Sequence, residues 1–121
     1  MVIYHIAFRA DWDAAVTAGE YRISTRGRTL DQQGFIHAST LTQVADTANT
    51  FYADAQDLLV LVINPARLTA PLRYDPVPGA PDPFPHIYGP LNIDAVTDTA
   101  ELGRDADGRY VFEGVRTSSQ E

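Results

Sequence analysis

Runs of hydrophobic residues along the chain predict a domain rich in short β-strands. Residues 2–8 are rich in β-forming side chains, and strand alternation places Tyr4 and Ile6 on one face and His5 on the other. Residues 57–64 contain six consecutive aliphatic side chains, which predicts a central strand buried on both faces. Further strands are expected at residues 34–39, 72–75, 84–88 and 109–112. Residues 93–102 fit either a strand or a helix, and a strand is favoured.

Two helices are predicted between these strands. Residues 41–52 carry apolar side chains at helical spacing, and Thr40 with Gln43 forms a capping-box pattern in front of them. A shorter helix is expected to begin with Asp11 as its cap and to end at Gly19. The polar stretch 25–33 and the proline-rich stretch 76–83 are expected to be loops. The pattern therefore predicts an α+β fold.

Proline positions refine this prediction for the strand at residues 84–88. Pro85 has no N–H group to donate to a sheet ladder, so the strand is expected to lie at an edge or to be bulged. The whole chain has 121 residues, which fits one domain. We expect that domain to span residues 1–112, followed by a polar C-terminal tail at 113–121.

Composition excludes several kinds of chemistry. The chain has no cysteine, and all nine basic residues are arginine, so thiolate chemistry and lysine Schiff bases are impossible. The formal net charge of −7 argues against nucleic acid as a partner, although a local arginine cluster could bind a phosphate. No segment has the length and hydrophobicity of a membrane span or a signal peptide, which predicts a cytoplasmic protein that does not bind membranes.

Three histidines are the strongest chemical signal. His5, His37 and His86 each lie in an aromatic or aliphatic run, and we expect their rings to line one cleft as catalytic groups. The alternative is that each ring is a structural residue bonded to a neighbouring carbonyl. No metal is expected, because these histidines are about 32 and 49 residues apart and match no known ligand spacing.

Three further residues are candidates for binding a cofactor. Ser39 lies two residues after His37, too far for a nucleophile–base pair, and is expected to bind a ligand hydroxyl or to end the strand. Asp75 could orient a histidine or a ribose hydroxyl, or it could simply be a turn residue before the proline-rich stretch. Tyr88 could stack on a ligand ring.

Three motifs together resemble a known family. These are Tyr-His-Ile at 4–6, Gly-Phe-Ile-His-Ala-Ser at 34–39 and Phe-Pro-His-Ile-Tyr-Gly-Pro at 84–90. The combination resembles the DUF952 family of small bacterial proteins, over residues 2–112. The resemblance implies an ADP-ribosyltransferase-like fold, a split mixed or antiparallel β-sheet with two or three short helices, which binds NAD in its cleft.

The resemblance also implies roles for the histidines. His5 would contact the NAD ribose, His37 the base-side ribose or the nicotinamide, and His86 the acceptor or leaving group. His86 stands where glutamate-bearing transferases have glutamate, so ordinary ADP-ribosylation of protein side chains is in doubt. Two functions follow as expectations. One is a nucleotide binder or an enzyme of ADP-ribosyl or phosphoryl transfer, and the other is a non-enzymatic binding module with structural histidines. The oligomeric state stays open.

Overall fold

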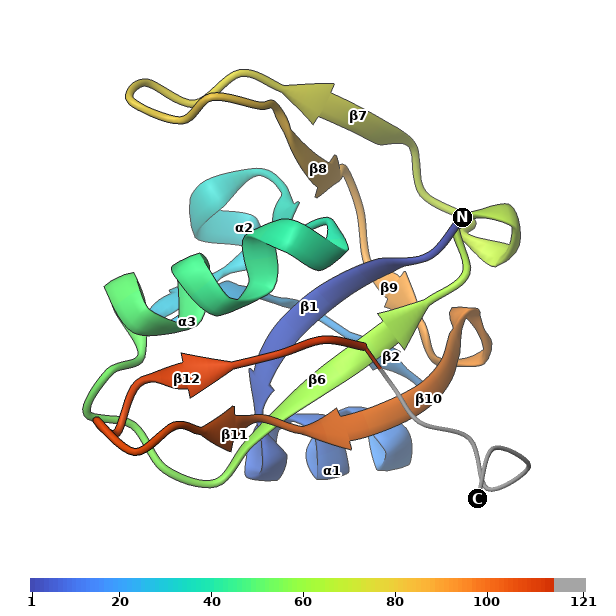
Figure 1. Cartoon of the computed structure of the whole chain (residues 1–121). Coiled ribbons are helices and arrows are strands. Elements are labelled where there is room, and N and C mark those ends of the chain that lie inside the picture. Colours follow the sequence, from blue (N-terminus) through green and yellow to red (C-terminus); the bar gives the residue numbers. More distant parts are fainter. Residues whose placement is uncertain (115–121) are drawn as a thin grey trace.

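Two three-stranded antiparallel sheets form the frame of the molecule (Figure 1). The structure is a computed structural model and describes residues 1–114. The first sheet has the order β1-β6-β10, and the second has the order β5-β8-β7. Tyr4 and Ser39 join the two sheets, because each backbone N–H donates to the carbonyl of the other at 2.8 and 2.7 Å. The predicted α+β class is confirmed. The strands are β1 (Ile3–Phe8), β5 (Ile36–His37), β6 (Leu58–Ile63), β7 (Leu72–Asp75), β8 (Phe84–Ile87) and β10 (Val96–Glu101).

Shorter elements complete the fold. Three two-stranded sheets pair β2 with β9, β3 with β4, and β11 with β12. Their strands are β2 (Glu20–Tyr21), β3 (Ile23–Thr25), β4 (Arg28–Thr29), β9 (Leu91–Asn92), β11 (Gly103–Arg104) and β12 (Tyr110–Val111). Single 3₁₀ turns occur at Leu41–Gln43, Pro65–Arg67 and Ile93–Ala95.

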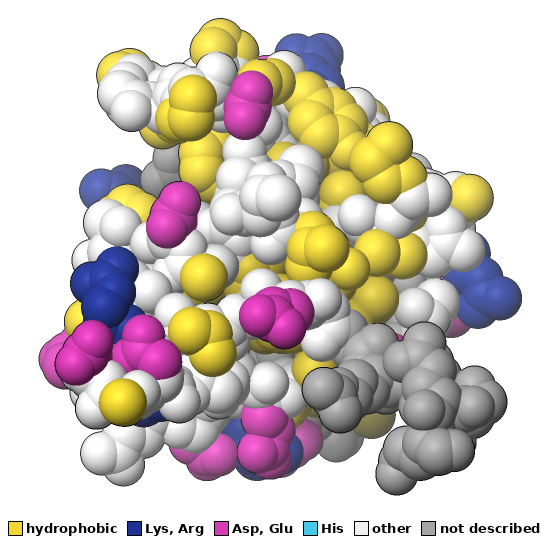
Figure 2. Space-filling model, in the orientation of Figure 1, with side chains coloured by type: hydrophobic (Ala, Val, Ile, Leu, Met, Phe, Trp, Pro, Cys, Tyr) yellow, Lys and Arg dark blue, Asp and Glu magenta, His cyan; other side chains and the backbone are white. Residues whose placement is uncertain are grey.

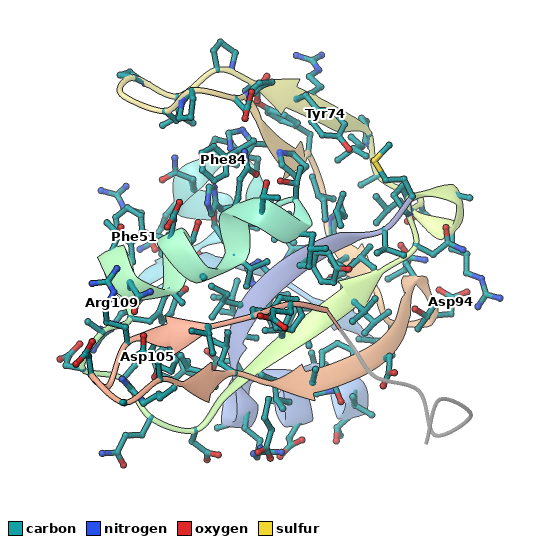
Figure 3. The ribbon with its side chains drawn as sticks, viewed as in Figure 1. Phe51, Tyr74, Phe84, Asp94, Asp105 and Arg109 are labelled. Atoms are coloured by element: carbon teal, nitrogen blue, oxygen red, sulfur yellow. The ribbon has the colours of Figure 1, made fainter. Side chains whose placement is uncertain are left out.

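Charged side chains of both signs gather around the turn between β11 and β12, where Figure 3 labels Asp105 and Arg109 (Figures 2 and 3).

The helices partly follow the sequence prediction. Helix α1 (Arg9–Ala18) ends at Gly19, whose φ of 95° is the left-handed geometry that glycine adopts without strain. Its N-cap is Phe8, so the prediction that Asp11 caps this helix is wrong. Asp11 lies in the first turn, where its negative charge interacts favourably with the positive end of the helix dipole. Helix α3 (Val44–Phe51) follows a 3₁₀ turn in which the Thr40 N–H donates to Gln43 Oε1 at 2.9 Å.

The stretch 25–33 is not the loop that its polarity predicted. It contains the β3–β4 hairpin, which turns at Gly27 with φ 77°, and then the short helix α2 (Leu30–Gln33). A capping box starts α2: the Thr29 N–H donates to Gln32 Oε1, and the Gln32 N–H donates to the Thr29 hydroxyl. A four-residue helix is too short to show a hydrophobic period, and so the prediction failed here.

The hydrophobic core fills both faces of the first sheet. All six side chains of β6 are buried, which confirms the predicted central strand. On β1, Ile3 and Ala7 pack toward Tyr21 and the second sheet. Tyr4 and Ile6 point to the opposite face and pack toward α3, as the strand alternation predicted. The core on the α3 side is completed by Val44, Ala48, Tyr52 and Tyr110. This arrangement turns His5 toward the second sheet.

Strand β8 is central, so the prediction of an edge position for residues 84–88 is wrong. It pairs with β7 on one side and with β5 on the other. In an antiparallel strand the N–H and C=O of one residue point to the same side. The Pro85 carbonyl accepts from the Ala38 N–H at 3.0 Å, so its missing donor also lies on that side, just beyond the end of β5. Only one ladder bond is lost there.

Two further findings concern the chain as a whole. Within residues 1–114 no helix combines the length and the hydrophobicity that a membrane crossing requires. The predicted tail begins at Glu113, and residues 115–121 lie outside the described part of the chain.

Candidate functional site

The second sheet gathers aromatic, histidine and acidic side chains on one face. His37 and His86 are directly paired across β5 and β8, and Asp75 on β7 lies diagonally across from His86. Side chains two residues apart on a strand share a face, so Phe84 and Tyr88 stand beside His86 on the same side. Local strand geometry therefore builds the site.

Asp75 and Phe35 hold His86 directly, and Tyr88 in turn holds Asp75. Its Nδ1–H donates to Asp75 Oδ2 at 2.7 Å, and the Tyr88 hydroxyl donates to the same carboxylate oxygen. Phe35 stacks on the imidazole with ring centroids 3.9 Å apart. The two hydrogen bonds, that of Tyr88 first, lower the pKa of Asp75, and the carboxylate raises the pKa of Tyr88. His86 is 5% exposed, and Asp75 and Phe35 fix the orientation of its ring.

His37 lies between the other two histidines. Its ring centroid is 5.4 Å from that of His86 and 5.0 Å from that of Phe84. Burial, helped by the neighbouring His5 and His86, lowers the pKa of His37 to about 4. The imidazole is therefore neutral near pH 7.

His5 is enclosed by protein groups. Its Nδ1 lies 2.5 Å from the His37 carbonyl oxygen, and its Nε2 lies 2.9 Å from the Tyr21 hydroxyl. Burial lowers the pKa of His5 to about 4, so the ring is neutral. A carbonyl only accepts, so Nδ1 carries the proton and donates it, and Nε2 accepts from Tyr21. Burial in turn raises the pKa of Tyr21.

A cavity of about 470 Å³ opens beside this histidine pair. His37, His86 and Phe35 form one side of it, and the β3–β4 hairpin with α2 supplies much of the rest. Phe51, at the C-terminal end of α3 and labelled in Figure 3, is 57% exposed and borders the cavity. The remaining lining residues are Ser24, Thr25, Arg26, Arg28, Gln33 and Val77. The volume is typical of sites for small molecules.

Two buried polar atoms at this cavity have no hydrogen-bond partner among the described residues. They are the Ser24 hydroxyl oxygen and His86 Nε2. Ser24 has no exposed surface, and His86 is nearly as buried. A buried polar group without a partner costs on the order of 1–3 kcal/mol. Neither atom has accessible surface in this structure, so a ligand in the cavity could bond them only after neighbouring side chains shift.

The cavity is also positive in an otherwise acidic chain. Arg26 and Arg28 both line it, and none of its lining residues in the described chain is Asp or Glu. Arg26 forms an ion pair with Asp54 at 2.6 Å, whereas Arg28 makes a long contact of 3.4 Å with Gln33 Oε1. Arginine presents several donors in a plane and suits phosphate oxygens well.

The predicted site residues are placed as follows. His37 and His86 line the cavity, whereas His5 lies behind His37. Asp75 and Tyr88 contact the site through His86 and do not border the cavity. The Ser39 hydroxyl is buried 3.4 Å from the Thr47 hydroxyl, away from the cavity. Their catalytic and binding roles stay predictions.

Sequence analysis missed several lining residues. Ser24, Gln33 and Phe51 carry no motif, and only a tertiary contact brings them together. The two arginines flanking Gly27 were a usable signal, because a glycine with a basic residue on each side suggests a tight turn that presents both charges. Across residues 1–114 no cluster of three or more His, Asp or Glu side chains is arranged to hold a metal ion.

Comparisons with known proteins place the chain in a family. Residues 6–99 match the family model of DUF952, described as a protein of unknown function, and the chain belongs to this family. The crystal structure of protein CC0527 from Caulobacter crescentus is similar at 34% identity, with 92% of this chain and 94% of that chain covered and a TM-score of 0.78.

Two further structures of CC0527 agree. A double mutant is similar at 33% identity, 92% and 94% coverage and a TM-score of 0.78. The solution NMR structure is similar at 35% identity, 89% and 90% coverage and a TM-score of 0.72. No functionally curated protein matches the chain.

Proposed function

We propose that this member of the DUF952 family binds a small anionic, nucleotide-like ligand in the cavity beside His37 and His86. The observation that carries the proposal is the cavity of about 470 Å³, which two arginines and the His37–His86 pair line in an otherwise acidic chain. A ligand whose binding shifts the side chains around Ser24 and His86 would also give their buried polar atoms partners, and its affinity would gain from this.

Charge and aromatic surface favour a nucleotide over a neutral ligand. Arg26 and Arg28 offer guanidinium groups for phosphate oxygens, and Phe51 offers a ring face on which a base can stack. NAD, ADP-ribose and AMP each contain phosphate and an adenine base. The proposed ADP-ribosyltransferase-like fold is compatible with this ligand class and is supported by two antiparallel three-stranded sheets joined side by side.

The alternative of three purely structural histidines fits only one of them. Both ring nitrogens of His5 are bonded to protein atoms, as a structural residue requires. His86 has only one bonded nitrogen, and its other nitrogen is buried without a partner although the residue lines the cavity. This contrast supports a ligand-binding role for His86.

Substitution of Ser24 tests the proposal directly. Ser24→Ala removes a buried hydroxyl that has no partner, so the free energy of unfolding without ligand is expected to stay level or to rise. The affinity for NAD, ADP-ribose or AMP, measured by isothermal titration, is expected to fall about tenfold for whichever of them binds, about 1.4 kcal/mol. Ser39→Ala is the matched control, because this buried serine contacts Thr47 and does not line the cavity.

Histidine ring resonances give a second reading of the same titration. Saturating ligand is expected to shift the ring signals of His37 and His86 and to leave that of His5 nearly unchanged, since His5 does not line the cavity. The proposal fails if none of the three nucleotides binds with a Kd below about 1 mM, or if Ser24→Ala and Ser39→Ala change the affinity equally.

A further inference from the structure

The outer edge of strand β7 presents backbone groups that the sheet does not use. β7 pairs with β8 on one side, and no strand within residues 1–114 pairs with its other side. The Pro71 carbonyl accepts from the Tyr88 N–H at 2.8 Å, so Pro71 faces β8. Because the bonding direction alternates along an antiparallel strand, the N–H and C=O of Leu72 and Tyr74 point away from β8. An open edge of this kind is a template for pairing with another chain.

The side chains at this edge are complementary to themselves. Tyr74, labelled on β7 in Figure 3, is 46% exposed. Arg73 and Asp75 flank it, and both lie on the face of the sheet that carries His86. If two β7 strands run antiparallel with their Tyr74 residues opposite each other, Arg73 of each copy falls opposite Asp75 of the other copy. Opposite charges placed in this way stabilise a strand pair.

We propose that two copies of this chain pair through β7, with Tyr74 at the two-fold axis, and so join their second sheets across the interface. The inference goes beyond ligand binding and does not depend on it. In this register the Tyr74 N–H of each copy donates to the Tyr74 carbonyl of the other copy. Each Leu72 N–H donates to the Pro76 carbonyl of the other copy. The Arg73–Asp75 contacts are non-hydrogen-bonded pairs, in which the side chains approach most closely.

Charge selects this register over its neighbours. Moving the axis to Arg73 would set two guanidinium groups opposite each other, and moving it to Asp75 would set two carboxylates opposite each other. Like charges directly opposite destabilise a strand pair. Pro76 has no N–H to donate, so the ladder ends at this residue. Each copy therefore offers one short contact, and the symmetric pair closes as a dimer without growing into a fibre.

The dimer would also touch the candidate site. Asp75 accepts from His86 Nδ1 at 2.7 Å, so the pairing brings Arg73 of the second copy beside the carboxylate that orients this histidine. Strand β7 has four residues, and an interface built on it is small. We therefore expect a reversible dimer with a Kd of about 1–100 μM.

Sedimentation equilibrium of the full chain from about 5 to 500 μM tests the proposal, and the wild type is expected to shift from monomer toward dimer across this range. Tyr74→Pro removes the N–H at the axis and spares the β7–β8 ladder, because that N–H points away from β8. Its Kd should rise beyond about 500 μM. Circular dichroism establishes that the variant is folded. A wild type that stays monomeric throughout would overturn the proposal and leave the edge to solvent or to a peptide strand.

Reversing a charge tests the register within the same measurement. Arg73→Glu sets a carboxylate opposite Asp75 of the other copy at both contacts, and the Kd should rise about tenfold or more at low salt. Arg109→Glu is the matched control, because it makes the same charge change in the turn between β11 and β12 and should leave the Kd unchanged. Equal effects of the two substitutions would overturn the proposed pairing of Arg73 with Asp75.

Single cysteines locate the axis, because the chain has none of its own. In Tyr74→Cys the two Cα atoms would lie about 5.5 Å apart, which a disulfide can span. In Arg73→Cys strand rise would separate them by roughly 8 Å, which it cannot span. Val16→Cys, on α1 with a 52% exposed side chain, measures random collision.

Under mild oxidation at about 100 μM protein, Tyr74→Cys should form the cross-linked dimer about tenfold faster than Arg73→Cys or Val16→Cys. Cross-linking of Tyr74→Cys at the rate of Val16→Cys would overturn the proposal, and faster cross-linking of Arg73→Cys would overturn the register. This measurement does not require Tyr74→Pro to fold.

Discussion

His5 fixes the backbone of the strand that carries His37. Its Nδ1–H donates to the His37 carbonyl, and its Nε2 accepts from the Tyr21 hydroxyl, so one buried ring links β1, β2 and β5. This relationship between His5 and His37 explains why a histidine outside the cavity still matters for the geometry of the site.

Replacing His5 should therefore cost stability. His5→Ala leaves the His37 carbonyl and the Tyr21 hydroxyl without partners in the core, and we expect a loss on the order of 2–4 kcal/mol in the free energy of unfolding. Tyr21→Phe keeps the aromatic packing and removes one bond, so its cost should be about 1–2 kcal/mol. Urea denaturation measures both values. Equal, small losses in the two variants would contradict this account of His5.

Stability should also fall as the pH falls below neutral. His5 and His37 have pKa values lowered from 6.5 to about 4 in the fold, so between these values the unfolded chain binds more protons than the folded one. The free energy of unfolding then rises with pH across this window and falls on acidification, by at most on the order of 3 kcal/mol per histidine.

Urea denaturation at pH 7 and pH 4.5 measures this dependence, and the difference should shrink in His37→Gln, which removes one titrating group. A free energy of unfolding that stays constant between the two pH values would show that the histidines are not buried in the neutral form.

Gly89 leaves no room for a side chain beside the site. A Cβ atom at this position would lie 2.8 Å from the Ala70 Cβ, which is closer than packed carbon atoms approach. Gly89→Ala is expected to cost on the order of 1–3 kcal/mol and to weaken ligand binding by displacing Tyr88. The double variant Gly89→Ala with Ala70→Gly removes the clash and should recover most of the stability. If it does not, the cost has another source than this contact.

Arg28 should contribute to ligand affinity through charge. Arg28→Gln is expected to weaken nucleotide binding about tenfold at low salt and much less at 0.5 M salt, because salt screens the attraction to phosphate. Arg67→Gln, which changes an arginine that does not line the cavity, serves as the control and should leave affinity unchanged. Equal effects of the two substitutions would indicate a nonspecific charge effect.

Patterns among residues close in sequence predicted much of the fold, but they did not predict which strands pair with one another. The aliphatic run of β6, the Gly19 helix end and the bond between Thr40 and Gln43 all depend on near neighbours in sequence. The central position of β8 depends on β5 and β7, and a strand sequence with Pro85 says only that one donor is missing.

The same limit applies to the site. The histidines stand out by composition, but the pairing of His37 with His86 is a matter of strand register, which the sequence leaves open. The orphaned Ser24 hydroxyl has no sequence signal at all, because whether a hydroxyl finds a partner is decided by the surrounding tertiary structure.

Val77 belongs to two cavities at once. It lines the one beside the histidines and also a neighbouring one of about 550 Å³, which the proline-rich loop forms with α3 and the turn before it. The proline-rich loop, which lies outside the sheets and helices, therefore contributes to the walls of both cavities. In the proposed binding function, substitutions in this loop would alter ligand selectivity while the hydrophobic core and the Asp75–His86 pair stay intact.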